Sequence, residues 1–223
     1  MKTNVLCLLK NMDKKDVELQ LALQCAPVIT GIKVSNLFII DKNKVDEVYN
    51  IIDETDISAY FLYEDAAKAN ILLYRKNELQ QYLFQKENRQ FVRKLGYDSV
   101  YLDELLPEFA IRFSMYQTIQ EDFPHEMGIL LGYPVEDVEG FIINNGKNEL
   151  YTGYWKVYDN LTEKLILFNY YEAAREHFIC LVAKGMDMNT ILMMYSRARK
   201  KYLQFHQWCD NIDVLQKSDG RKR

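Results

Sequence analysis

The spacing of hydrophobic residues divides the first third of the chain into helical and extended segments. Val17, Leu21 and Cys25 recur at steps of four, which is the spacing of one helical face. Pro27 is expected to break this helix, because the residue before a proline disfavours the helical conformation. Apolar, β-branched and aromatic residues dominate three later segments that are typical of strands, and these are 35–40, 57–64 and 70–76.

Helical periodicity marks three further segments before residue 121, and these are 43–53, 77–95 and 107–120. Pro107 suits the first turn of the last of them, since a proline there loses no hydrogen bond. Residues 149–159 predict another strand, in which Tyr154, Lys156 and Tyr158 alternate with Trp155 and Val157. From Leu161 to about Val214 the pattern is helical again, with an interruption at Gly185.

This order of elements predicts one α/β or α+β domain over residues 1–215, followed by a flexible basic tail over 216–223. Strands and helices interleave in the first half, and helices dominate the second. We therefore expect a small mixed sheet of about four strands, covered by helices, with a helical C-terminal part. The 4 Pro and 9 Gly of the chain favour long helices over an all-β fold with many turns.

Three glycines share one local setting. Gly96, Gly132 and Gly185 each follow a helical run, and each is followed by a bulky residue and then by Asp or Pro. A glycine adopts the left-handed conformation that ends a helix, and the bulky residue closes the hydrophobic contact that accompanies it. The sequence therefore predicts three helix-to-helix corners.

Charge and cysteine content argue against several classes of protein. The net charge of -4 argues against a nucleic-acid-binding protein, although residues 197–201 form a short basic run. No stretch approaches the ~20 apolar residues of a membrane span, so we expect no membrane partner. The four cysteines lack the paired spacing of a structural zinc site, and we expect no metal. Since the N-terminal apolar run is too short for a signal peptide, we expect reduced thiols and a cytoplasmic protein.

Residues 123–142, "FPHEMGILLGYPVEDVEGFI", repeat the order aromatic, Pro, any residue, Glu after ten positions. Placing Pro124 and Pro134 at the first helical position puts Glu126 and Glu136 at the third. A carboxylate there faces the free N–H groups and the positive end of the helix dipole. The pattern predicts two short helices, each begun by a proline.

His125 is the residue of this segment that the helix pattern leaves unexplained. A helix N-terminus should lower its pKa and keep the imidazole neutral, which suits a base, a ligand or a structural hydrogen bond. A zinc protease motif is excluded, because HExxH would need a histidine where Ile129 stands. His125, Glu126 and Cys25 form the candidate catalytic set. Cys25 is either a nucleophile near a helix start or a buried member of the first helical stripe.

Lys156 stands between large aromatic residues in "GYWKVY". Together with Trp155, Tyr133 and Asn36 it forms the candidate ligand-binding set, suited to a planar or anionic ligand. The alternative is an ordinary strand with one lysine that extends its charged head to solvent. No phosphate loop, dinucleotide fingerprint or nucleophile elbow is present, so the sequence identifies no cofactor.

Three stretches together resemble a bacterial family of uncharacterised proteins, catalogued as domain of unknown function family 3793, from anaerobic Firmicutes and related gut bacteria. They are "CAPVITGIKVSNLF" (25–38), "FPHEMGILLGYPVEDVEGF" (123–141) and "WKVY" (155–158). The resemblance covers roughly residues 15–180 and implies a bacterial host. It implies no activity, so no catalytic role is carried over. In this family a Cys often precedes WKVY, whereas this chain has Tyr154, so no second essential thiol is implied.

Three functions are compatible with these patterns. The first is a small-molecule enzyme or cofactor-binding protein, because polar residues of the motifs fall at helix starts and strand ends, where α/β proteins build sites. The second is a non-catalytic interaction or regulatory protein, with room for a homo-oligomer through an exposed stripe of Ile191, Met194 and Tyr202. The third is nucleic-acid binding through the basic run 197–201.

Overall fold

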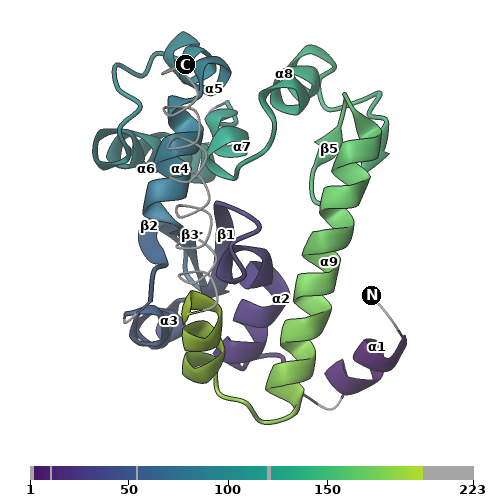
Figure 1. The fold of residues 1–223 in the computed structure, drawn as a ribbon. Helices are drawn as coiled ribbons and strands as arrows, with labels where there is room; N and C mark the ends of the chain where they lie inside the picture. Colours follow the sequence, from purple (N-terminus) through teal and green to yellow (C-terminus); the bar gives the residue numbers. More distant parts are fainter. Residues whose placement is uncertain (1–2, 11, 54, 120–121, 198–223) are drawn as a thin grey trace, which may run out of the picture.

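The computed structural model describes residues 3–10, 12–53, 55–119 and 122–197. A three-stranded antiparallel sheet lies at its centre, in the order β1-β3-β2 (Figure 1), and its strands are β1 (Ser35–Asp41), β2 (Ser58–Glu64) and β3 (Lys68–Tyr74). Within the central strand, Ile71 pairs with Phe38 on one side and with Phe61 on the other. The three strands predicted in the first half of the chain are confirmed.

One face of the sheet packs against the helices of the N-terminal and C-terminal parts. Because side chains alternate along a strand, β1 and β3 direct Phe38, Ile40, Ile71 and Leu73 to this core. The helices are α1 (Thr3–Leu9), α2 (Val17–Ile29), α3 (Val45–Ile52) after the short turn η1 (Lys42–Lys44), and α9 (Leu161–Ala183). A further helical segment, 188–197, buries Ile191 in the same core, whereas Met194 is exposed.

The opposite face of the sheet packs against the helices of the middle of the chain. Leu62, Leu72 and Tyr74 point to this second core. The helices are α4 (Lys76–Phe84), α5 (Lys86–Lys94), α6 (Leu102–Ile119), α7 (Glu126–Leu130) and α8 (Val135–Ile143). The sheet therefore separates two hydrophobic cores.

A two-stranded hairpin of β4 (Tyr151–Thr152) and β5 (Lys156–Val157) stands apart from the main sheet and packs on α9. The predicted strand 149–159 turns back on itself here, and Gly153 in the turn lies against the ring of Phe168. A Cβ at Gly153 would come within 2.3 Å of that ring. Helix α9 extends from this hairpin to α1 and α2 (Figure 1). The α/β class with a helical C-terminal part is confirmed, and the strands form two antiparallel sheets of three and two.

Pro27 does not break its helix, contrary to the prediction. Helix α2 continues to Ile29, and Pro27 lies inside it. The carbonyl groups that end the helix find partners outside it. The Pro27 carbonyl accepts the backbone N–H groups of Ile32 and Lys33, and Arg75 donates to the next two carbonyls. These hydrogen bonds stabilise the end of the helix, which extends two residues beyond the proline.

Pro107 likewise lies inside α6 rather than in its first turn. The helix begins at Leu102, because Gln80 of α4 accepts the Leu102 N–H at 2.9 Å and donates to the Val100 carbonyl at 2.9 Å. The single helix predicted over 77–95 is also divided in two. Gln85 is extended between α4 and α5, and buried Asn88 donates to the Tyr82 carbonyl across the break.

The three glycine corners are confirmed. Gly96, Gly132 and Gly185 have φ angles of 91°, 71° and 78°, and each ends or follows a helix. The C-terminal end of the helical prediction and the basic tail 216–223 lie outside the described residues.

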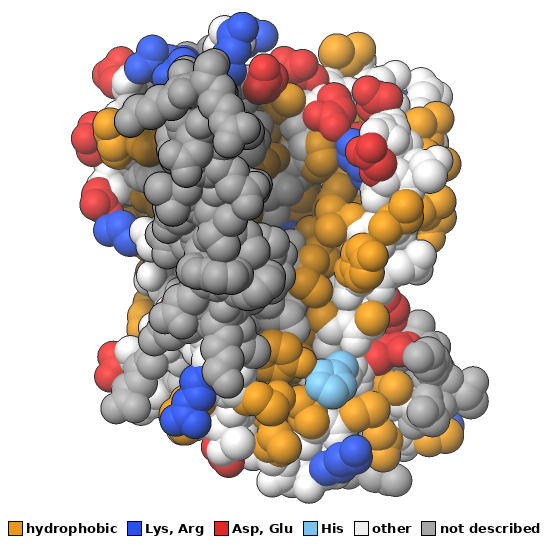
Figure 2. Space-filling view, viewed as in Figure 1, with side chains coloured by type: hydrophobic (Ala, Val, Ile, Leu, Met, Phe, Trp, Pro, Cys, Tyr) orange, Lys and Arg blue, Asp and Glu red, His pale blue; other side chains and the backbone are white. Residues whose placement is uncertain are grey.

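Exposed hydrophobic side chains are grouped on the face of the molecule that Figure 2 shows. Figure 2 shows a band of them down one face of the molecule, with charged side chains gathered near its upper and lower ends. Among the helices that the structure describes, none is long and apolar enough to cross a membrane.

Candidate functional site

Residues 123–142 form the two short helices that the sequence predicts, but both prolines lie one or more positions earlier than expected. Pro134 has an extended ψ of 136° and precedes α8, so Glu136 is the second residue of that helix. Glu126 is the first residue of α7. Gly132 turns the chain between the helices, where a Cβ would come within 2.7 Å of the Val34 side chain. The close approach of Val34, the residue before β1, and the positive φ of Gly132 thus require glycine here.

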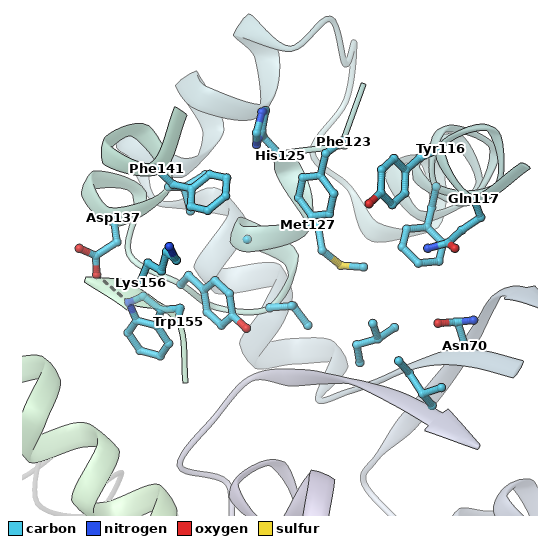
Figure 3. A pocket seen from close by; sticks show the side chains of 17 residues that line it. Asn70, Tyr116, Gln117, Phe123, His125, Met127, Asp137, Phe141, Trp155 and Lys156 are labelled. Carbon is cyan, nitrogen blue, oxygen red and sulfur yellow. Dashed lines mark hydrogen bonds between the residues drawn. The ribbon is translucent and has the colours of Figure 1, made fainter. Parts of the chain in front are cut away.

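A cavity with a volume of ≈ 470 Å³ opens beside this segment. It lies between β1, β3, α6, the α7–α8 region and the β4–β5 hairpin (Figure 3). Its walls are mainly aromatic and aliphatic, and the ring-bearing side chains are Phe113, Tyr116, Phe123, His125, Tyr133, Phe141 and Trp155. This size and composition match the small-molecule sites of proteins, which are largely apolar with a few polar groups.

The wall at one end of the cavity is rigid because its aromatic residues are stacked and hydrogen-bonded. Tyr133 stacks on Trp155 with ring centroids 4.8 Å apart. The Trp155 indole donates to the buried carboxylate of Asp137 at 2.7 Å, and the same carboxylate accepts the N–H groups of Tyr158 and Asp159. Three donors therefore satisfy the buried charge of Asp137.

His125 lies at the cavity between two aromatic rings. Its imidazole contacts Phe123 and Phe141 edge-on, with centroids 5.5 Å and 6.0 Å away. Partial burial lowers the pKa of His125, and the carboxylates of Glu126 and Asp122 oppose this effect. The imidazole is therefore neutral at pH 7, and it can accept or donate one hydrogen bond to a bound molecule.

Lys156 also lines the cavity, but its charge is already paired. Its ammonium group donates to the Gly146 carbonyl at 2.7 Å and lies 3.2 Å from the Glu149 carboxylate. These contacts hold Lys156 in the hairpin wall and reduce its value as a free anion-binding group.

Glu126 turns away from the cavity although it adjoins His125 in sequence. Its carboxylate is buried and accepts the Tyr97 hydroxyl at 2.7 Å, with the Arg112 guanidinium 3.7 Å away. Arg112 in turn lies over the Tyr97 ring, 4.0 Å from its centroid. This cluster fastens α7 to α6 and to the corner at Gly96.

Cys25 and Asn36 belong to a second buried cluster that does not line the cavity. Burial raises the pKa of the Cys25 thiol to about 12, so the thiolate needed for nucleophilic attack is strongly disfavoured. Asn36 lies 4.0 Å from the Cys25 sulfur and accepts a hydrogen bond from Lys33 at 2.9 Å. The structure thus places His125, Tyr133, Trp155 and Lys156 at one cavity and leaves Cys25, Asn36 and Glu126 outside it.

Lys33 is a buried lysine that the sequence reasoning missed. Its amine donates to the Ser35 carbonyl at 2.8 Å and to Asn36, and it lies 5.3 Å from the centre of the Tyr133 ring. Burial lowers the pKa of Lys33 to about 7. The Lys33 amine therefore lies over the ring of Tyr133, which forms part of the cavity wall.

Asn70, Tyr116 and Gln117 are further cavity residues that the sequence reasoning missed. Asn70 carried a readable signal, because it is the one amide in the otherwise apolar stretch "ANILLY" of a strand. Tyr116 and Gln117 carried none, since polar residues near the end of an amphipathic helix are ordinary. Within the described ranges, no group of three His, Cys, Asp or Glu side chains is arranged to hold a metal ion.

The fold and the cavity define a helix-rich α/β protein with one aromatic site between its central sheet and a β-hairpin. A family model described as a protein of unknown function (DUF3793) matches residues 21–192, and the chain belongs to this family. The resemblance seen in the sequence motifs is thereby confirmed. No curated protein matches the chain, and no solved structure matches it.

Proposed function

We propose that the protein binds a small, ring-containing molecule in the cavity beside α7 and α8, as a cofactor-binding protein or small-molecule enzyme of the cytoplasm of a bacterium. The observation that carries this proposal is the cavity of ≈ 470 Å³, with aromatic side chains converging from helices, loop and hairpin. Aromatic walls of this kind stack on planar rings, and each contact of this type is worth about 0.5–1.5 kcal/mol.

Binding is better supported than Cys–His catalysis. The Cys25 thiol lies in a separate buried cluster, and Glu126 is engaged by Tyr97. Asp137 and Lys156 are paired within the protein, so His125 is the candidate group at the cavity for a proton transfer near pH 7. The identity of the ligand decides whether His125 acts as a base or only as a hydrogen-bond partner.

A matched pair of variants tests the proposal. Ile39 lines the cavity and is 42% exposed, whereas Ile32 is 41% exposed and does not line it. Ile39→Trp should fill the cavity, and Ile32→Trp should leave it open. Both substitutions add the same side chain at equally exposed positions, so their effects on stability alone should be similar.

The readout is the melting temperature of the purified protein with a panel of planar aromatic and heteroaromatic compounds. A ligand at 100 times its Kd should raise the melting temperature of the wild type and of Ile32→Trp by about 5–10 °C. The same ligand should leave Ile39→Trp unchanged. Equal shifts in both variants, or no shift with any compound, would contradict the proposal.

A non-catalytic interaction role is the second candidate, supported by an exposed stripe along α6. Ile111, Met115 and Ile119 follow one another at steps of four, and all three are exposed. A partner helix or a second copy of the chain could cover such a stripe. Light scattering at several concentrations tests this: concentration-dependent association that Ile119→Lys abolishes supports the role, and a monomer throughout argues against self-association.

The predicted homo-oligomer and nucleic-acid-binding roles depend on the apolar stripe of Ile191, Met194 and Tyr202 and on the basic run 197–201. The structure describes only part of these residues. Ile191 is buried in the core, Met194 is exposed, and Tyr202 lies outside the described residues. Of the basic run 197–201, only Arg197 is described. Nucleic-acid binding through this run stays a prediction, which a salt-dependent gel shift would test.

A further inference from the structure

Asn70 occupies a position where the fold calls for an apolar side chain. It lies in the central strand β3, on the face that carries Leu72 and Tyr74 to the second core. Every other residue from Ala69 to Tyr74 is apolar or aromatic and buried. Asparagine is depleted in strands, and only 8% of Asn70 is exposed. An amide in this position costs stability unless it is hydrogen-bonded.

The side chain of Asn70 makes no hydrogen bond to any of the residues that the structure describes, and it lines the cavity. Figure 3 shows its amide rising from the strand into the cavity, at the end opposite Asp137 and Trp155, with Gln117 on the helix across from it. Buried polar groups in folded proteins are almost always satisfied, by protein, water or ligand. The Asn70 amide faces the cavity, so a hydrogen-bonding group of a bound molecule can reach it there.

The charges around the cavity are neutralised within the protein. Asp137 accepts three hydrogen bonds, and Lys156 is paired with Glu149 and the Gly146 carbonyl. Burial lowers the pKa of His125, so its imidazole is uncharged at pH 7. A charged group inserted among these walls would lose its hydration without gaining a counter-ion. The inserted part of the ligand should therefore be neutral.

We propose that Asn70 recognises the edge of a neutral, planar heteroaromatic ligand that carries a cyclic amide, an inference that rests on the proposed small-molecule function. A carboxamide presents one N–H donor and one carbonyl acceptor in the same plane. A ring –CO–NH– edge presents the complementary acceptor and donor, so the two groups form a paired hydrogen bond. The ring system itself lies among the aromatic walls, and Gln117 at the rim offers a second amide to the same end of the ligand.

Two pairs of probes separate this recognition from simple ring stacking. Quinazolin-4-one and lumichrome are neutral bicyclic and tricyclic compounds with a cyclic amide edge. Quinazoline and phenazine have the same number of fused rings without that edge. Binding of each probe is measured by calorimetry or fluorescence to the wild type, to Asn70→Leu and to Asn70→Thr.

The two variants remove the amide in different ways. Leucine has a similar volume and extends the apolar row of Leu72, so the free variant should melt higher than the wild type. Threonine is smaller and favoured in strands, which keeps the test valid should leucine obstruct the cavity. Both should weaken binding of the amide-bearing probes by at least about 10-fold, which corresponds to one lost bidentate pair. Binding of quinazoline and phenazine should change by less than about 2-fold.

The outcomes distinguish the two proposals. If all four probes bind and neither variant changes the affinity for the amide-bearing pair, Asn70 is hydrated rather than ligand-bound, and the inference is overturned while the small-molecule function stands. If no probe binds to the full chain at concentrations up to its solubility limit, the proposed function falls and the role of Asn70 falls with it. A selective loss for quinazolin-4-one and lumichrome supports both.

Discussion

The indole of Trp155 donates to the carboxylate of Asp137 over 2.7 Å and thereby fastens the β4–β5 hairpin to α8. The two residues belong to separate sequence motifs, 18 positions apart. The same carboxylate accepts two backbone N–H groups just beyond the hairpin. One buried acid therefore fixes the aromatic wall of the cavity.

Asp137→Ala should lower the free energy of unfolding by about 2–4 kcal/mol, because the buried indole of Trp155 and two partly buried backbone N–H groups lose their acceptor. Glu139→Ala is the matched control on the same helix. Glu139 is partly exposed and lies 3.6 Å from exposed Lys94, so its loss should cost less than about 0.5 kcal/mol. Urea denaturation measures both values. Equal effects of the two substitutions would show that the hydrogen bonds of Asp137 do not stabilise the contact between the hairpin and α8.

Arg75 closes the C-terminal end of α2, and its removal should be costly. Its side chain donates to the carbonyls of Val28 and Ile29 at 2.7 Å each and pairs with Asp56, while only 2% of Arg75 is exposed. Arg75→Met should lower the free energy of unfolding by about 2–4 kcal/mol, because two buried carbonyl groups lose their donors.

Arg75→Lys should not restore this stability, since an ammonium group lacks the planar fork that reaches three acceptors. Lys76→Met is the neighbouring control, because the Lys76–Asp103 pair is exposed. Thermal unfolding compares the three variants, and a melting temperature for Arg75→Lys equal to the wild type would exclude the fork as the stabilising feature.

Substitutions of Glu126 test the catalytic role that the sequence predicts for it. Glu126→Gln keeps an acceptor for the Tyr97 hydroxyl, so the free energy of unfolding should change by about 1 kcal/mol or less. Glu126→Ala should lower the free energy of unfolding by about 2–3 kcal/mol, because the buried hydroxyl of Tyr97 loses its acceptor. Neither variant should change ligand affinity. Loss of binding in Glu126→Gln with unchanged stability would place its carboxylate in the site.

Cys25 should resist alkylation in the folded protein. Burial raises the pKa of its thiol to about 12, whereas Cys7 is exposed. Iodoacetamide at pH 8 should modify Cys7 within minutes and leave Cys25 unmodified until the protein unfolds. Peptide mass spectrometry after timed quenching follows each cysteine. Modification of Cys25 as fast as that of Cys7 would indicate an accessible, reactive thiol.

Lys33 should make the stability depend on pH. Burial lowers the pKa of Lys33 from 10.5 to about 7, so the folded state binds fewer protons than the unfolded state between these values. The free energy of unfolding should therefore rise from pH 7 upward. Above pH 9 the raised pKa of Cys25 acts in the opposite direction, because the unfolded thiol loses its proton first. The net increase in the free energy of unfolding should therefore occur between pH 7 and 9.

Lys33→Met tests this assignment, because methionine keeps most of the length of the buried side chain without a titrating group. Urea denaturation at half-unit pH steps should show a flat profile between pH 7 and 9 in the variant. A slope that persists in Lys33→Met must come from other groups.

Local sequence patterns were sufficient for most of the elements. The strands β1, β2 and β3 follow from runs of apolar residues, and the corners at Gly96, Gly132 and Gly185 follow from glycine placement. These features depend on the conformational preferences of neighbouring residues. The errors at Pro27 and Pro107 arose where a distant side chain, Arg75 or Gln80, completed the hydrogen bonds of a helix end.

By itself, the sequence determined the α/β class, the order of the elements, the motifs of the family and four residues of the cavity, among them His125 and Trp155. The tertiary structure alone decided which polar residues share a cavity. Neighbours in sequence point apart, as His125 and Glu126 do, because successive residues of a helix face different sides. Residues distant in sequence, such as Asn70 and Gln117, meet only because the sheet and α6 pack together.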